Sequence, residues 1–248
     1  MDQGELYIGT SGWSYKHWKG TFYPEKLPAS KQLDFYLRHY NAVELNGSFY
    51  RLPSAETIEN WMSRFPEGFK VCAKANRFTS HLKKLHDPEI TFERFFSVFD
   101  SMIAFMGPIL VQLPANLAFH EEVAENFYKV LSRTYSAYRF AIEVRHPTWF
   151  TPQSIGLMKQ YGVTLVIAQS SQFPYHEEIT ARDVYLRLHG PGKLYDSSYS
   201  SKELADFAAR IREWRQSGHD VWVFFNNDVH TYAIDNANTL RKMLGVGT

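Results

Sequence analysis

Polar residues of the kinds that bind and transform small molecules follow short apolar runs at a regular spacing. Glu143 is followed two residues later by Arg145, and Arg187 by His189. Side chains alternate between the two faces of a strand, so residues two apart point the same way. Four further apolar runs end on polar residues that we place on the same face, namely Glu44, Asn46, Lys74, Gln112 and Asn226.

These residue types point to acid–base chemistry on an anionic compound. Glu143 and Glu44 are candidate general bases, and His189 is a candidate acid or second base because free imidazole titrates near neutral pH. The five charged side chains carry one more positive than negative charge, which suits a phosphate or carboxylate. The residues expected to bind substrate are Lys74, Arg145, Arg187, Asn226, Asn46 and Gln112.

A glycine-containing, aromatic-rich segment follows the first apolar run. It reads G-T-S-G-W-S-Y, and its Trp13 and Tyr15 could stack on a sugar or base. The same rings could instead pin a long loop to the rest of the protein. We include both residues among the candidate substrate contacts.

Apolar runs of strand length alternate with longer amphipathic segments along the chain. The expected strands are Leu6–Thr10, Ala42–Asn46, Phe69–Ala73, Pro108–Leu113, Arg139–Val144, Thr164–Ala168, Asp183–Leu188 and Asp220–Phe225. The expected helices are Lys31–Tyr40, Ala55–Phe65, Phe92–Phe105, Glu121–Arg133, Pro152–Tyr161, Lys202–Ser217 and Asn236–Leu244.

Eight strands alternating with helices predict an α/β fold, specifically a closed (β/α)8 or TIM barrel. Residues 170–182, after the sixth strand, show no helical period, so a loop is expected to replace that helix. With 248 residues and no linker, one domain over residues 1–248 is expected. In such barrels the carboxyl ends of the strands form the active site, where the polar residues above would meet.

Composition narrows the class of protein further. The 27 Lys and Arg residues nearly balance the 26 Asp and Glu residues, so there is no chain-wide attraction to nucleic acid or acidic membranes. The single cysteine, Cys72, rules out an internal disulfide and is expected to fill the core. The sequence shows neither a signal peptide nor an apolar run of membrane-spanning length, which predicts a cytoplasmic location and no membrane partner.

Several motifs taken together resemble the YecE-like family, also called domain of unknown function 72. They include G-T-S-G-W-S-Y, V-E-L-N-G-S-F-Y, E-V-R-H-P-T-W, L-R-L-H-G and F-F-N-N-D, spread from near the N-terminus to the last helix. The resemblance implies a TIM barrel and no settled activity. It also implies that the family's characteristic positions are Glu44, Lys74, Glu143, Arg145, Arg187, His189 and Asn226. One departure is Thr79-Ser80-His81, where the family pattern has Thr and His adjacent.

Three functions remain open at this point. The first is an enzyme for a small anionic substrate, with a hydrolase, lyase or isomerase reaction. The second is a barrel that binds or cleaves nucleic acid, suggested by the rim aromatics and by basic residues between Lys70 and Asp87. The third is a non-catalytic ligand-binding protein. No cofactor and no metal residue is predicted, although Glu44, Glu143, His189 and Asp228 could act as hard ligands for a divalent ion.

Overall fold

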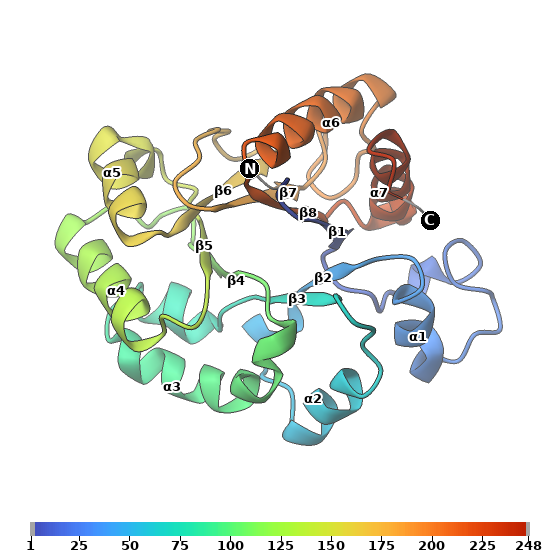
Figure 1. Cartoon of the computed structure of the whole chain (residues 1–248), viewed down its shortest axis with the longest axis horizontal. Helices are drawn as coiled ribbons and strands as arrows, with labels where there is room; N and C mark the ends of the chain where they lie inside the picture. The colour runs from blue at the N-terminus through green and yellow to red at the C-terminus, as the bar shows by residue number, and fades with distance from the viewer. Residues whose placement is uncertain (1–2, 247–248) are drawn as a thin grey trace.

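Eight parallel strands form the centre of the protein in a computed structural model that describes residues 3–246 (Figure 1). Each strand matches its predicted range to within one residue at either end. The strands are β1 (Leu6–Thr10), β2 (Ala42–Leu45), β3 (Lys70–Ala73), β4 (Ile109–Gln112), β5 (Phe140–Glu143), β6 (Thr164–Gln169), β7 (Asp183–Leu188) and β8 (Asp220–Phe225).

The predicted closed eight-stranded barrel is wrong. Six strands form one parallel sheet in the order β1-β8-β7-β6-β5-β4, and β2 and β3 pair in a separate two-stranded sheet. The smaller sheet is joined to β1 and β4 only by isolated bridges, at Ser11–Glu44 on one side and at Val71–Met106 and Lys74–Leu110 on the other. We call these two junctions the β1–β2 seam and the β3–β4 seam.

Side chains replace backbone pairing at the β1–β2 seam. The Tyr36 hydroxyl accepts a hydrogen bond from the Thr10 N–H at 2.9 Å and donates one to the Ala42 carbonyl at 3.0 Å. Asn41 accepts from the Ile8 N–H at 3.0 Å and donates to the Leu6 carbonyl at 2.8 Å. These groups satisfy the strand edges, which would otherwise leave buried donors and acceptors unpaired.

At the β3–β4 seam, the sequence removes a donor. Pro108 immediately precedes β4 and has no N–H to give to a ladder. Two backbone hydrogen bonds remain here, from Gly107 N to Val71 O at 2.9 Å and from Ala75 N to Leu110 O at 2.8 Å. Neither seam therefore forms a continuous ladder.

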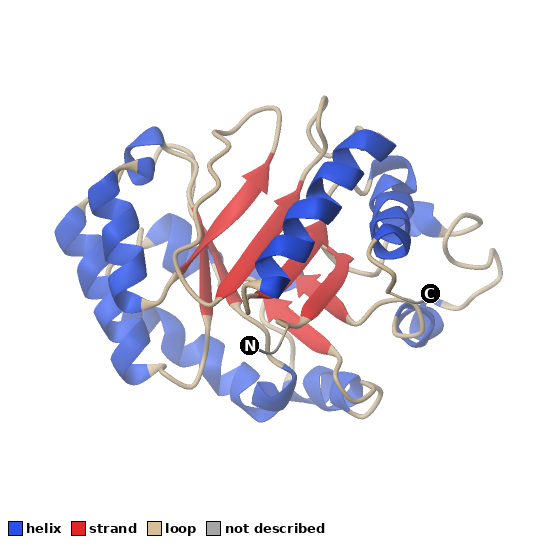
Figure 2. Ribbon diagram, turned by 45° about the horizontal axis from the view of Figure 1, so that its top comes forward, coloured by secondary structure: helices blue, strands red, loops and turns tan. Residues whose placement is uncertain are grey.

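Helices surround the strands on their outer side (Figures 1 and 2). They are α1 (Gln32–Tyr36), α2 (Ala55–Met62), α3 (Pro88–Phe99), α4 (Glu121–Thr134), α5 (Pro152–Tyr161), α6 (Ser201–Gln216) and α7 (Tyr232–Met243). Residues 170–182, all of them described, contain no helix, in agreement with the expected loop. Within residues 3–246, no helix has both the length and the apolar character needed to cross a bilayer.

Two of the helix starts expected from capping residues are present in the structure. The Ser200–Glu203 capping box and the Thr151-Pro152 start are present. The expected helix Phe92–Phe105 divides into α3, which begins earlier at Pro88, and a 3-10 segment, Asp100–Phe105.

The faces of the strands that point away from the helices carry a small inner core. It consists of Ala42, Cys72, Leu110, Ala141, Val166, Ala168, Tyr185, Trp222 and Phe224. Six of these residues lie two positions before a polar residue of the predicted site, as Cys72 lies before Lys74 and Ala141 before Glu143. The inner core thus forms the layer directly beneath the candidate site.

Candidate functional site

Arg187 on β7 joins carboxylates from two other strands. Its Nε and Nη2 donate to the two oxygens of Glu44 at 2.8 and 2.7 Å, and its Nη1 donates to Glu143. All three side chains are at most 1% exposed. Residues expected to face inward from β2, β5 and β7 therefore do converge, although the barrel is not closed.

Both carboxylate oxygens of Glu44 accept hydrogen bonds. In addition to Arg187, Oε1 accepts from the Ser11 hydroxyl at 2.7 Å and Oε2 from the Tyr185 hydroxyl at 2.9 Å. Burial alone would raise the pKa of this carboxyl, but the charge and hydrogen bonds of Arg187 outweigh burial and lower it. Glu44 is thus an ionised, fully engaged carboxylate.

Glu143 is shared between two guanidinium groups. Arg145 donates from Nε to Oε1 at 2.7 Å, its Nη2 forms an ion pair with the same oxygen at 2.7 Å, and Arg187 holds Oε2. Burial opposes ionisation here too, but Arg187 and Arg145 hold the pKa of Glu143 well below its usual value. The guanidinium of Arg145 also lies 4.0 Å from the Phe173 ring in the loop after β6. Two carboxylates and two guanidinium groups therefore balance in charge.

Lys74 is the cation left over from this balance. Its Nζ donates to Gln112 Oε1 at 2.6 Å and lies 4.3 Å from the centre of the Phe49 ring. Among the described residues it forms no ion pair with a carboxylate. Burial, followed by the nearby charge of Arg187, lowers the pKa of Lys74 from 10.5 to about 7.

His189 is buried with one ring nitrogen engaged. The Asn226 amide donates to Nδ1 at 3.0 Å, so Nε2 carries the proton of the neutral ring. Within residues 3–246, Nε2 has no hydrogen-bond partner; Glu143 Oε2, at 3.8 Å, is too far away. Burial and the charge of Arg187 lower the pKa of His189, which favours the neutral form.

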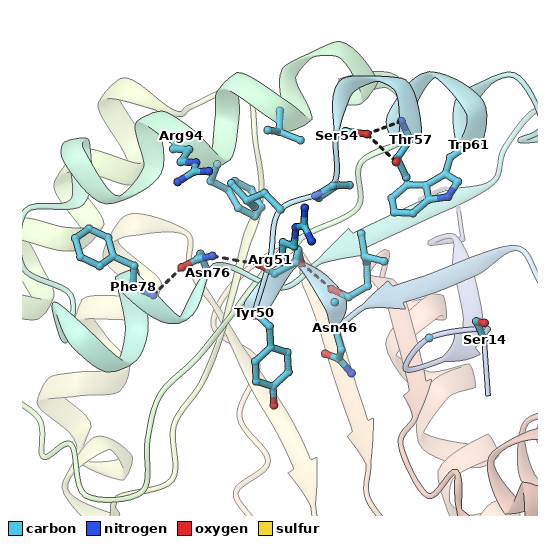
Figure 3. A pocket seen from close by; sticks show the side chains of 18 of the residues that line it. Ser14, Asn46, Tyr50, Arg51, Ser54, Thr57, Trp61, Asn76, Phe78 and Arg94 are labelled. Carbon is cyan, nitrogen blue, oxygen red and sulfur yellow. Dashed lines mark hydrogen bonds between the residues drawn. The ribbon is translucent and has the colours of Figure 1, made fainter. Parts of the chain in front are cut away.

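The other predicted residues lie in an adjacent groove of about 1220 Å³. It runs between residues 11–15, residues 45–54, α2, residues 76–78 and α3 (Figure 3). Trp13, Tyr15 and Asn46 line it, and Trp13 packs edge-on against Trp61 at 5.2 Å. The predicted site residues thus divide into a buried network and a neighbouring groove, with Ser11 contacting both.

Two residues outside the predicted site set, Tyr185 and His81, also lie at the network. Tyr185 contacts Glu44 and shares the strand parity of Arg187, so alternation could have identified it. His81 packs edge-on against Phe49 at 5.0 Å, next to Lys74. It lies in a π-helical turn, Phe78–Leu82, which contains the extra residue Ser80 noted in the sequence.

The basic residues between positions 70 and 87 do not share one face. Lys70 begins β3 and binds the Ala104 carbonyl, whereas Lys74 follows the opposite end of the strand. Lys83 pairs with Asp87 at 2.8 Å. This distribution lacks the continuous stripe that nucleic-acid backbones require. Among the residues described, no group of three or more His, Cys, Asp or Glu side chains is placed to hold a metal ion.

Comparisons with known proteins match almost the whole chain. A family model described as "Protein of unknown function DUF72" matches residues 7–248. UPF0759 protein YunF of Bacillus subtilis is 26% identical, and the alignment covers 97% of this chain and 95% of YunF. UPF0759 protein YecE of Escherichia coli K12 is 25% identical, with coverage of 86% and 83%.

Solved structures agree with this match. A DUF72 family protein from Thermotoga maritima superposes with a TM-score of 0.85 at 28% identity, covering 97% of this chain and 99% of that one. A DUF72 family protein from Enterococcus faecalis superposes with a TM-score of 0.84 at 21% identity, covering 98% and 96%. None of these names states an activity.

Proposed function

This chain belongs to the DUF72 family, and because that family's description supplies no activity, we propose a function from the site alone: an enzyme that binds a small substrate bearing a phosphate or carboxylate. The substrate would lie at the carboxyl ends of β3, β5 and β7. Acid–base catalysis, as in a hydrolase, lyase or isomerase, is the corresponding reaction class. The cytoplasm remains the expected location.

The observation that carries this proposal is the unpaired cation. Arg187 and Arg145 neutralise Glu44 and Glu143, so the positive charge of Lys74 has no counter-ion in the described protein. A buried ammonium without a counter-ion is costly, and an incoming anion would relieve that cost. Desolvation also strengthens the attraction between the two charges.

The adjacent groove is also lined by positive charge. Its described lining contains Arg51 and Arg94 and no carboxylate. Trp13 and Tyr15 line the same groove, and the Oδ1 atom of Asn46 is buried without a hydrogen-bond partner among the described residues. We assign the groove to the part of the substrate that does not react.

The contacts favour different roles for the three predicted catalytic residues. Glu44 and Glu143 have their oxygens engaged and lowered pKa values, which suits holding Arg187 and Arg145 in place rather than accepting protons. His189 has a lowered pKa, and among the described residues its Nε2–H has no partner, so the neutral ring suits hydrogen-bond donation to an oxygen of the substrate. Asn226 would fix its tautomer, and Gln112 would orient Lys74.

The proposal is tested by thermal shift and by turnover. Inorganic phosphate, pyruvate and a panel of phosphorylated metabolites are added to wild type, Lys74→Met and Lys202→Met at matched ionic strength. Lys202, on α6, has a side chain 87% exposed and is the matched control. Loss of one charge-assisted contact should weaken binding about tenfold or more in Lys74→Met only.

Two results would contradict the proposal. Equal ligand responses in all three proteins would remove the site as the place of binding. Turnover is measured by mass spectrometry of the mixtures. Binding of a metabolite without its conversion would favour the non-catalytic alternative instead.

A further inference from the structure

Lys74 differs from the other cations of the site in the groups that surround it. Its ammonium contacts a neutral amide oxygen of Gln112 and an aromatic face of Phe49, whereas Arg145 and Arg187 each contact carboxylates. A lysine held by neutral groups in a buried position can lose its proton and act as a nucleophile. An arginine cannot do so, because its guanidinium stays protonated.

We propose that Lys74 forms an imine with the carbonyl carbon of an anionic aldehyde or ketone bound at this site. The inference rests on the proposed function, since it takes the same site and narrows its substrates to carbonyl compounds. Amino-acid residues alone supply the chemistry, and no oxidant or reductant is consumed.

The step is balanced as a condensation. The lone pair of Nζ attacks the carbonyl carbon, and the carbonyl oxygen takes a proton to give a carbinolamine. Nitrogen loses one proton, the hydroxyl leaves with a proton as water to give a protonated C=N bond, and loss of the second proton from nitrogen gives the imine. Amine and carbonyl therefore give imine and one water molecule, and hydrolysis reverses the step.

Neighbouring groups suit this sequence of proton transfers. Arg145 engages Glu143 through Nε and Nη2, which leaves Nη1 to meet the anionic group of the substrate. His81 packs against the same Phe49 ring as Lys74, and burial together with the charge of Lys74 lowers its pKa. A neutral imidazole that packs on the same ring as the reacting nitrogen can accept and return protons.

The lowered pKa of Lys74 supports the same proposal as these contacts. With a pKa of about 7, a large fraction of Lys74 is the free amine at neutral pH. Exposed lysines titrate near 10.4, so almost none of their amine is free under these conditions. Reaction with a carbonyl at neutral pH should therefore select a buried lysine over the exposed ones.

Borohydride trapping tests the inference on the intact protein. Glyceraldehyde 3-phosphate or pyruvate is added at neutral pH, sodium borohydride reduces any imine to a secondary amine, and peptide mass mapping locates the adduct. Uncharged glyceraldehyde is the matched carbonyl without an anionic group. Lys193 and Lys202, with side chains 77% and 87% exposed, are the internal references.

The expected result is an adduct on Lys74 at least tenfold more abundant than on either reference lysine. It should form with the anionic probes in preference to glyceraldehyde, decrease with added inorganic phosphate, and disappear in Lys74→Arg. If the variant fails to fold, the comparison of Lys74 with the reference lysines in the wild-type peptide map still tests the inference.

Three outcomes would overturn the inference, and they can be distinguished from one another. If phosphate and the probes raise the melting temperature of wild type but not of Lys74→Met, and no adduct forms on Lys74, the imine is wrong and the anion site stands. If neither a thermal response nor an adduct is seen, the proposed function fails together with the inference. Equal labelling of Lys74 and the exposed lysines also contradicts it.

Discussion

Lys74 shows how the end of a strand can hold a cation that lacks a counter-ion. The backbone of Lys74 is fixed on both sides, since its N–H donates to Leu45 O at 3.1 Å and its carbonyl accepts from the Ser48 hydroxyl at 2.7 Å. The side chain therefore starts from a fixed point at the end of β3, where Gln112 and Phe49 hold its ammonium group in a buried position. The cost of burying the charge appears as a lowered pKa.

This shift predicts a pH-dependent stability at the residue scale. Between about pH 7 and pH 10.5, the unfolded chain keeps a proton on Lys74 that the folded protein has lost. The free energy of unfolding therefore rises with pH across this window because of Lys74, and its unfavourable contribution is complete below about pH 7. Lys74→Met lacks this contribution, so the wild-type value minus the variant value should increase from pH 7 to pH 10.

Urea denaturation of both proteins at several pH values measures that difference. Subtracting the variant cancels the titrating groups that do not interact with Lys74. Glu44, Glu143 and His81 have lowered pKa values, so they do not change protonation state between pH 7 and pH 10. Lys202→Met should give a difference that stays constant with pH. A constant difference for Lys74→Met as well would mean that Lys74 keeps its proton in the folded protein.

At the scale of elements, the β1–β2 seam depends on side chains of α1 and of the turn after it. Tyr36, the last residue of α1, places its hydroxyl between Thr10 and Ala42. Gly9 on β1 passes so close to β2 that a Cβ there would lie 2.0 Å from the Ala42 carbonyl oxygen. The seam is therefore tightly packed even though its backbone ladder is interrupted.

Removal of the Tyr36 hydroxyl should destabilise the protein by about 2 kcal/mol or more. Tyr36→Phe leaves the buried Thr10 N–H and Ala42 carbonyl without a partner, at about 1–3 kcal/mol for each group. Tyr128→Phe is the matched control, because the buried Tyr128 hydroxyl has no partner among the described residues. Equal effects of the two variants on the free energy of unfolding would show that the seam does not need the Tyr36 bridge.

At the scale of the whole molecule, the buried ion network connects the two sheets. Glu44 belongs to the two-stranded sheet, while Glu143 and Arg187 belong to the six-stranded sheet. Arg187 therefore spans the interior between sheets whose backbone pairing along the seams, among the described residues, is limited to isolated bridges. Side-chain ion pairs take part of the role that a closed ladder would have.

Arg187→Met should therefore cost about 3–5 kcal/mol, because two buried carboxylates lose their main partner. Arg210→Met is the control: its ion pair with Glu177 lies at the surface, with both side chains 30% exposed, and should contribute at most about 1 kcal/mol. Chemical denaturation gives both values. A cost for Arg187→Met as small as that of the control would contradict the connecting role.

Sequence by itself determined the strands, most of the helices and the common face of the polar residues, since these follow from local alternation, capping and hydrophobic period. It could not determine sheet closure, because closure depends on how Tyr36, Asn41 and Pro108 meet strands that are distant in the chain. Nor could it show that Glu44 and Glu143 are paired with guanidinium groups while Lys74 has no carboxylate partner among the described residues. Ion-pair partners are chosen by distance in space, and only the tertiary structure decided that Arg187 reaches both carboxylates.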